Sequence, residues 1–391
     1  RRAGLVAAAI VAVSPVLIWF SQDARAYALA FLLSALAFLF FARARRSGAR
    51  RDLAWWAVFS ALAIATHYFA GFAVVPEAAL LLLAARPSRK LPSAGRDWGA
   101  TVLAVCGVVL VALALLPLAL RQAENAHAAW IAEQPIGQRL ERSAAKLVGD
   151  DNGNEHGKRQ PGPIPLGLYF ALALASPALL LLRGDREARR GAGLAAVVGL
   201  GAVALALLLA PFGADYLDGR NLVPVFAPLV VLLGAGYGAR RAGWAGLGLG
   251  AALCLCALVF TLEVDRLPRL QREDLRNAAA QVGTLRPGVA VVTIRYATNQ
   301  PLIYYLGARE ARAPLPPLRE IDLVGSAAAE RRAGRLLPPA FRRVESKPVS
   351  YDFTLARYRA ARPVRVPLSL LERGALVGGA RRASVLVAGS G

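Results

Sequence analysis

A short polar stretch between two long apolar runs carries the first residues that can do chemistry. Residues 18–27 read IWFSQDARAY, so Gln22, Asp23 and Arg25 follow one apolar run and precede the next. Charged groups beside a bilayer are costly and indicate a functional site. We expect Gln22 and Arg25, three residues apart on one helical face, to bind a phosphate or a sugar hydroxyl. The alternative is helix-end chemistry, with Ser21 as the N-cap and Arg25 reaching lipid headgroups.

A second polar stretch, residues 215–221 with the sequence DYLDGRN, precedes another apolar run. It combines acidic, basic and aromatic side chains. Arg220 is the strongest candidate for a phosphate-binding residue, because a guanidinium forms paired, charge-assisted hydrogen bonds with phosphate oxygens. Asp218 and Asn221 are candidate substrate-binding residues beside it. The alternative is an ordinary loop that places Arg220 at the membrane interface.

Further candidates lie in two other polar segments. His67 and Tyr68 interrupt the apolar region 53–85 and are expected to bind substrate, although a histidine between apolar helices is often only a packed, hydrogen-bonded residue. In the loop 121–163, Trp130 is either a sugar-stacking platform or an interfacial anchor. The same loop has acidic residues and a histidine near residues 150–156, where a solvated loop is favoured over a metal site because no fixed ligand spacing is present.

The elements that position these residues are apolar segments of membrane-spanning length. The chain has 391 residues, 56% of them hydrophobic, and a mean hydropathy of +0.45. These values indicate a polytopic α-helical membrane protein rather than a soluble one. The expected spans are residues 4–20, 26–42, 53–66, 68–85, 101–120, 164–182, 192–210, 221–238 and 244–262.

The basic residues orient these spans. The net charge of +22 comes mainly from arginines that fall between apolar runs, as in cytoplasmic loops of membrane proteins, so no nucleic acid partner is expected. Arginines flank region 53–85 on both sides, and a single helix of that length would exceed the hydrocarbon core of about 30 Å. Residues 53–85 are therefore expected to cross the membrane twice. Nine crossings place all the candidate residues on the extracytoplasmic face.

The remaining chain, residues 263–391, is charged and lacks a long apolar run. We expect a transmembrane domain over residues 1–262 and a small extracytoplasmic α/β domain over 263–391. In that domain the pattern predicts an amphipathic helix from Glu273 to about Leu285, a strand at 289–294 and a helix at 299–306. The Arg/Pro-rich stretch 309–347 is predicted to be an extended loop with one short helix near 325–335.

Four motifs, in order, resemble those of a known family. Residues 12–15 and 19–27 resemble its "SP…YSQEARMY" signature, 65–71 its "THYFG" segment, and 220–224 an "R(Y/N)L-x-P" motif, while 273–276 with 287–288 resembles the start of its outer domain. The family is that of polytopic GT-C glycosyltransferases, family 39, which includes protein mannosyltransferases and the lipid A aminoarabinose transferase.

The resemblance implies a reaction and a donor. It implies inverting transfer of a mannose-like or arabinose-like sugar from a polyprenyl-phosphate carrier to a glycan, lipid or protein acceptor, with Arg25 and Arg220 at the carrier phosphate. The usual base is an aspartate in the first outer loop of the family, which would precede Arg1. We therefore expect an N-terminally truncated chain, an unassigned catalytic base and Asp23 as a site-lining residue.

Two other functions stay open: a polysaccharide polymerase or ligase, and a lipid-linked sugar flippase or transporter. A transporter of this size typically has related halves, and the sequence has no internal repeat. Motifs for ATP or a nucleotide sugar do not occur in the sequence. No cofactor is predicted, with a divalent metal as an open alternative. The Ala, Arg and Gly content favours a bacterial cytoplasmic membrane as the location.

Overall fold

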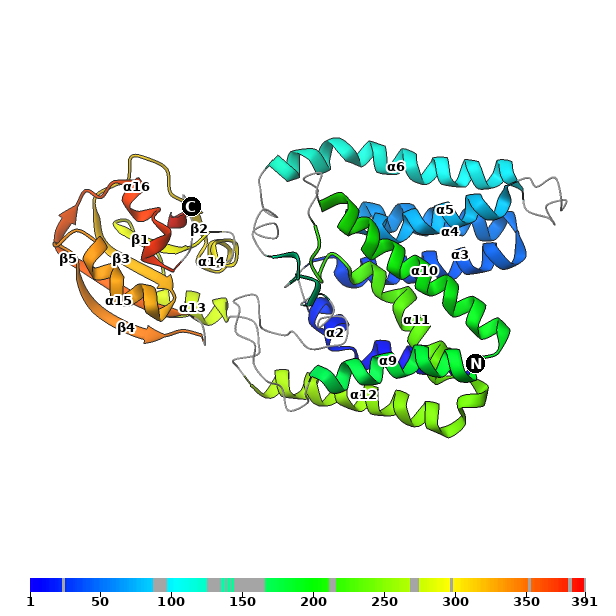
Figure 1. The fold of residues 1–391 in the computed structure, drawn as a ribbon. Helices are drawn as coiled ribbons and strands as arrows, with labels where there is room; N and C mark the ends of the chain where they lie inside the picture. The colour runs from blue at the N-terminus through cyan, green and yellow to red at the C-terminus, as the bar shows by residue number, and fades with distance from the viewer. Residues whose placement is uncertain are drawn as a thin grey trace. The chain divides into compact units, whose positions relative to one another are not determined.

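The computed structural model describes residues 1–22, 25–86, 97–124, 135–137, 139–141, 143, 166–210, 216–267, 274–295, 298–350, 353–378 and 382–389. The chain divides into two compact units, Arg1–Arg266 and Leu267–Gly391. The first unit is helical, and the second is built on a β-sheet (Figure 1). Each unit is described by itself below.

Each segment expected to be an apolar span is helical over most of its described residues. The helices of the first unit are α1 (Arg2–Val13), α2 (Pro15–Ser21), α3 (Tyr27–Ser47), α4 (Arg50–Thr66), η1 (Tyr68–Ala70), α5 (Gly71–Ala85), α6 (Trp98–Glu124), α9 (Leu166–Arg183), α10 (Arg186–Leu209), η4 (Val223–Val225), α11 (Phe226–Tyr237), η5 (Arg240–Ala242) and α12 (Gly243–Arg266). Among the described residues, five helical segments are long and apolar enough to cross a membrane, namely α3, η1 with α5, α6, α10 and η5 with α12.

The first expected span is not one straight helix. A bend of 53° separates α1 from α2, and counting the pair as one span gives six. Ser14 is extended at this break and Pro15 begins α2, because proline lacks the N–H that would continue the helical ladder but fits a first helical turn. The Ser14 hydroxyl accepts a hydrogen bond from the Leu17 N–H at 3.5 Å.

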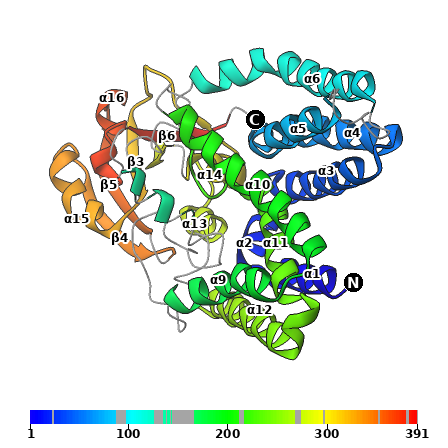
Figure 2. The same cartoon turned by 45° about the vertical axis from the view of Figure 1, so that its right-hand side comes forward.

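The helices of this unit pack in two groups. In both views α3, α4 and α5 lie side by side, with α6 against α4 and α5 (Figures 1 and 2). In the second group, α1, α9 and α10 pack around α11, and α12 packs on α9 and α1.

Hydrogen bonds from polar side chains also join the helices. The Tyr169 hydroxyl on α9 donates to the Cys256 carbonyl on α12 at 2.7 Å. Glu77 on α5 is 1% exposed and accepts a hydrogen bond from the indole N–H of Trp56 at 2.9 Å.

The second unit is a six-stranded mixed sheet with the order β2-β6-β1-β3-β5-β4. The strand pair β1/β3 is parallel and the other pairs are antiparallel. The elements are α13 (Leu275–Val282), β1 (Val289–Ile294), α14 (Asn299–Leu306), β2 (Ala308–Glu310), β3 (Leu318–Gly325), α15 (Ala327–Leu336), β4 (Arg342–Pro348), β5 (Thr354–Val364), α16 (Leu368–Leu371), η7 (Gly374–Leu376) and β6 (Ala383–Ala388).

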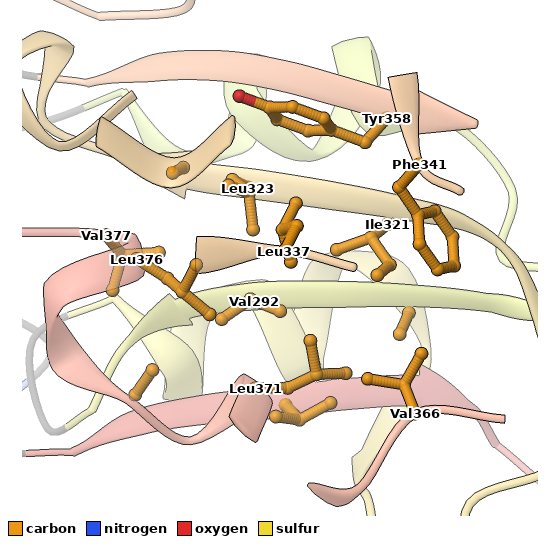
Figure 3. Packing of buried hydrophobic residues seen from close by; sticks show 14 of the residues in the cluster. Val292, Ile321, Leu323, Leu337, Phe341, Tyr358, Val366, Leu371, Leu376 and Val377 are labelled. Atoms are coloured by element: carbon orange, nitrogen blue, oxygen red, sulfur yellow. The ribbon is translucent and has the colours of Figure 1, made fainter. Parts of the chain in front are cut away.

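Both faces of the sheet are buried. Figure 3 shows one face, where Val292, Ile321 and Leu323 from the central strands meet Leu337 and Leu376 from the segments that cover them. The other face packs against α13 and α14 through a separate cluster, whose buried members are Ala278, Ala279, Val282, Leu285, Val291, Leu302, Val324, Val349, Phe353, Leu355 and Leu386. Burial on both faces explains why β1, which reads VAVVTI, is a nearly continuous apolar run.

The structure confirms the predicted strand at 289–294 and the predicted helix at 299–306. The predicted helix from Glu273 is shorter and begins after Asp274, whose side chain caps it by accepting from the Asn277 N–H at 2.9 Å. The short helix predicted near 325–335 is confirmed as α15. The extended loop predicted for the rest of 309–347 is wrong, because strands form there. This stretch contains β2, β3, α15 and β4.

The strands in 309–347 were not predicted because arginine and proline residues interrupt the apolar pattern of this stretch. Ile321 and Leu323 are buried between β1 and β5, whereas the prolines at 314, 316 and 317 precede the strand. The edge strand β4 reads RRVESKP and has no apolar alternation. Charged side chains on an edge strand oppose pairing with other chains, so this composition is typical of an edge.

An ionic network crosses the face of the sheet under α13. The Arg357 guanidinium on β5 donates to both carboxylate oxygens of Asp322 on β3 at 2.9 Å, to Glu345 on β4 at 2.9 Å and to the Val282 carbonyl at 3.0 Å. Glu320 lies 3.2 Å from the same guanidinium. Burial raises the pKa of Asp322, whereas the hydrogen bond and charge of Arg357 act to lower it. One arginine therefore joins three strands and the end of α13.

Candidate functional site

Three chain reversals at one end of the helical unit form the candidate site: the α2–α3 connection, the α4–η1 turn and the segment that leads into η4. His67 has an extended backbone, which ends α4 and lets η1 start in a new direction. The short helix η4 packs against α3, α5 and η1. The residues before η4 are thereby held beside the tip of the α4–η1 turn.

A continuous series of ring contacts joins these reversals. The ring centroids of Phe20 and Tyr27 lie 4.8 Å apart, and those of Tyr27 and His67 lie 5.2 Å apart. The series continues from His67 to Phe69 at 5.3 Å and from Phe69 to Tyr216 at 4.8 Å. Tilted aromatic pairs at such distances are favourable beyond the burial of their area. The ring series therefore fixes the three reversals relative to one another.

Polar side chains lie at both ends of this ring series. The Arg25 guanidinium donates to the Tyr27 hydroxyl at 3.4 Å. Asp218 accepts from the backbone N–H of Arg220 at 3.1 Å, and the same carboxylate oxygen lies 3.5 Å from the guanidinium Nε of Arg220. The Asn221 amide donates to the carbonyl of Tyr216 at 2.9 Å. Arg220 is thus held by its own loop, with its side chain 22% exposed.

The charges of Arg25 and Arg220 both affect the pKa of His67. Burial is the main cause that lowers its pKa to about 4, and the positive charges of Arg220 and then Arg25 act in the same direction. Its imidazole is therefore neutral near pH 7. Within the described part of the chain, the Nδ1 atom of His67 has no hydrogen-bond partner. A neutral imidazole with one free ring nitrogen can donate to, or accept from, a ligand.

This pKa predicts how the site responds to acid. The pKa of His67 in the folded state lies below its unfolded value of about 6.5, so the neutral side chain stabilises the fold above that pH. That contribution is lost as the pH falls from about 6.5 towards about 4.

Replacing Arg220 with glutamine removes a positive charge and is expected to raise the pKa of His67. Histidine NMR in nanodiscs measures it, with His67→Gln to assign the signal among the chain's three histidines. An unchanged pKa in the Arg220→Gln variant would contradict this electrostatic account.

The structure brings several predicted site residues together. Arg25, His67, Asp218, Arg220 and Asn221 surround the ring series, and Tyr68 begins η1 directly after His67. Asp23 and Trp130 lie outside the described residues, as does the acidic segment 150–156. Among the residues that are described, no group of three or more His, Cys, Asp or Glu side chains is arranged to hold a metal ion.

The local geometry predicted for the first stretch is wrong. Gln22 follows the end of α2 and Arg25 precedes the start of α3, so the two residues do not share a helical face. Ser21 does not cap a helix either, because α3 begins only at Tyr27 and has Ala26 as its N-cap. The Ser21 hydroxyl instead donates to the Ile18 carbonyl at 2.8 Å. Gln22 and Arg25 therefore both lie in the connection between α2 and α3 and not on a helix.

The rings that join the site were missed in the sequence. Tyr27, Phe69 and Tyr216 stand next to apolar residues, where aromatic side chains normally signal only burial. Each lies within two residues of a predicted polar residue, which marks it as a neighbour of the site but does not show which rings contact one another. Tyr27 is 4% exposed, so its ring is packed while its hydroxyl meets Arg25.

Comparisons of the chain with protein-family models, with curated proteins and with solved structures give no match. Two guanidinium groups, a neutral imidazole and a side-chain amide at the end of an apolar helical unit can bind an anion that carries an apolar tail.

Proposed function

We propose that the chain is a membrane glycosyltransferase that transfers a mannose-like or arabinose-like sugar from a polyprenyl-phosphate carrier to a glycan, lipid or protein acceptor. The observation that carries the proposal is the ring series through His67, which holds the segments of Arg25 and Arg220, far apart in the sequence, at one site. Guanidinium groups that converge at the end of apolar helices fit a lipid phosphate. The resemblance of the motifs to GT-C enzymes supports the same reaction.

In the proposed reaction, a lone pair of an acceptor oxygen forms the new bond to the anomeric carbon. The bond between that carbon and the carrier phosphate breaks, and the phosphate leaves with the electron pair. Arg25 and Arg220 stabilise the negative charge that develops on the phosphate, which is the type of interaction that contributes most to many enzymatic rates. A carboxylate outside the assigned residues takes the acceptor proton.

The remaining assignments follow from this reaction. Neutral His67 and the amide of Asn221 contact the sugar or the phosphate, and Gln22, Tyr68, Trp130 and Asp218 complete the substrate-binding set. We further propose nine crossings of a bacterial cytoplasmic membrane, with the site and the C-terminal unit on the extracytoplasmic side. No cofactor forms part of the proposal.

The test is a transfer assay with membranes that contain the full-length protein. Several radiolabelled polyprenyl-phosphate sugars are supplied, and both the labelled product and the movement of the carrier across liposomes are measured. Transfer of label to an acceptor is the expected result. Carrier movement without any transfer from these donors overturns the proposal in favour of a flippase, and transfer only from diphosphate-linked sugars overturns it in favour of a polymerase or ligase.

A further inference from the structure

Helix α15 of the C-terminal unit presents a stripe of arginines. Arg331, Arg332 and Arg335 are all exposed, and their spacing places them within one narrow arc of the helix. Ala328 lies in the same arc, so a small residue occupies the space between the long side chains. In the part of the chain that the structure describes, no ion pair neutralises these three arginines; Arg332 donates to the Ala328 carbonyl of its own helix at 3.3 Å.

The helix holds this stripe on a rigid support. Ala329 and Ala333 on its opposite side are 0% exposed, and Ala333 packs in the hydrophobic cluster on the sheet. The Ser326 hydroxyl caps the first turn by accepting from the Ala329 N–H at 3.3 Å. The one acidic residue of the helix, Glu330, accepts a hydrogen bond from Arg343 on β4 at 2.7 Å. Its charge is thus compensated beside the stripe.

We propose that the arginine stripe of α15, formed by Arg331, Arg332 and Arg335, docks on anionic phospholipid headgroups. Residues 267–274 join α12, an apolar helix of membrane-spanning length, to α13. A connection of this length reaches at most about 30 Å. This length keeps the C-terminal unit within reach of the surface of a membrane that α12 crosses, where the local concentration of headgroups is high.

The positive charge of the arginine stripe favours anionic headgroups as its binding partner. Guanidinium groups bind phosphate oxygens through paired hydrogen bonds, and clustered basic residues near an anionic bilayer gain binding free energy with each added charge. The arc carries no large apolar residue, so contact with headgroups fits it better than insertion among acyl chains. The proposal does not depend on the glycosyltransferase function, because it uses only the tether and the stripe.

The test uses the full chain in nanodiscs made of phosphatidylcholine alone or mixed with phosphatidylglycerol. Cys106, Cys254 and Cys256 are replaced by serine, and a fluorophore is placed on Ala328→Cys. Quenching of this fluorophore by headgroup nitroxides reports docking. We expect strong quenching only in the anionic discs. It should disappear in about 1 M salt, where the Debye length falls to about 3 Å.

Two triple variants carry the same change in charge. Replacing Arg331, Arg332 and Arg335 by glutamine is expected to lower the docking equilibrium constant about a hundredfold. The control replaces three exposed arginines elsewhere in the unit, namely Arg309, Arg312 and Arg319, and should keep docking within about threefold of the unmodified protein. Circular dichroism establishes that both variants are folded.

Three outcomes overturn the proposal. Equal quenching in neutral and anionic discs removes the role of headgroup charge. An equal loss in both triple variants assigns docking to the overall charge of the unit and not to α15. A fluorophore that responds to a soluble acidic polysaccharide, but not to anionic lipid, assigns the stripe to a glycan.

Discussion

Replacing Arg220 with glutamine is expected to lower the rate of sugar transfer about a hundredfold to a thousandfold, with normal amounts of folded protein in the membrane. Removing one preorganised donor from a developing negative charge has an effect of this size. Arg220 is held in place by Asp218 and is one of the two arginines that act on His67. The loss should appear mainly in kcat, because the charge on the phosphate grows as the bond to the sugar breaks.

A matched control separates this effect from a general loss of positive charge. Arg240 is an exposed arginine on η5, outside the candidate site. Arg240→Gln should transfer sugar at close to the normal rate. The transfer rate of Arg220→Lys should lie between those of Arg220→Gln and Arg240→Gln, because an ammonium keeps the charge but loses the paired hydrogen bonds. Equal rates for Arg220→Gln and Arg240→Gln would show that Arg220 is not at the reacting phosphate.

Replacing Arg357 with leucine is expected to destabilise the C-terminal unit by about 3–5 kcal/mol, the usual range when one partner of a buried ion pair is removed. The change leaves the Asp322 carboxylate, which is 0% exposed, without its guanidinium, and Glu345 loses the same partner. Pulse proteolysis of the full chain measures the population of the unfolded unit. The control is Arg359→Leu on the same strand. Its side chain is 57% exposed and its ion pair with Glu320 should contribute less than about 1 kcal/mol.

The loss in the Arg357→Leu variant should depend on pH in a defined direction. Burial raises the pKa of Asp322, and without Arg357 nothing in the network opposes this shift. A carboxyl group with a raised folded pKa favours folding at low pH and opposes it as the pH rises. The destabilisation should therefore be smaller at about pH 5 than at about pH 8. An effect that grows on acidification would contradict the assignment to Asp322.

The length of apolar runs predicted where the helices lie, because a helix needs about 20 residues to cross a bilayer and such runs are conspicuous. It did not predict the bend at Ser14, because residues 4–20 are apolar enough to be taken as one span, although Pro15 marks the helix break. The strand β3 was missed because its flanking arginines and prolines outweighed a short buried run. The strand β4 has no periodic signal at all, since a charged edge strand has no buried face to encode.

The candidate site was predictable in part. Arg25 and Arg220 stand out because charges are rare among apolar segments, and the charges of both lower the pKa of the same histidine, His67. The ring contacts that join them were not predictable from the sequence. Tyr27 and Tyr216 look like ordinary packed residues until the helix ends are placed in space.

Photocrosslinking tests the central claim most directly. A polyprenyl phosphate that carries a diazirine close to the phosphate is bound to the full-length protein in membranes, irradiated, and the labelled peptides are mapped by mass spectrometry. We expect label on the segments around Arg25, His67 and Arg220, with competition by unmodified polyprenyl phosphate and strong loss of label in Arg220→Gln. Competable label confined to other segments, and unchanged in Arg220→Gln, would contradict it.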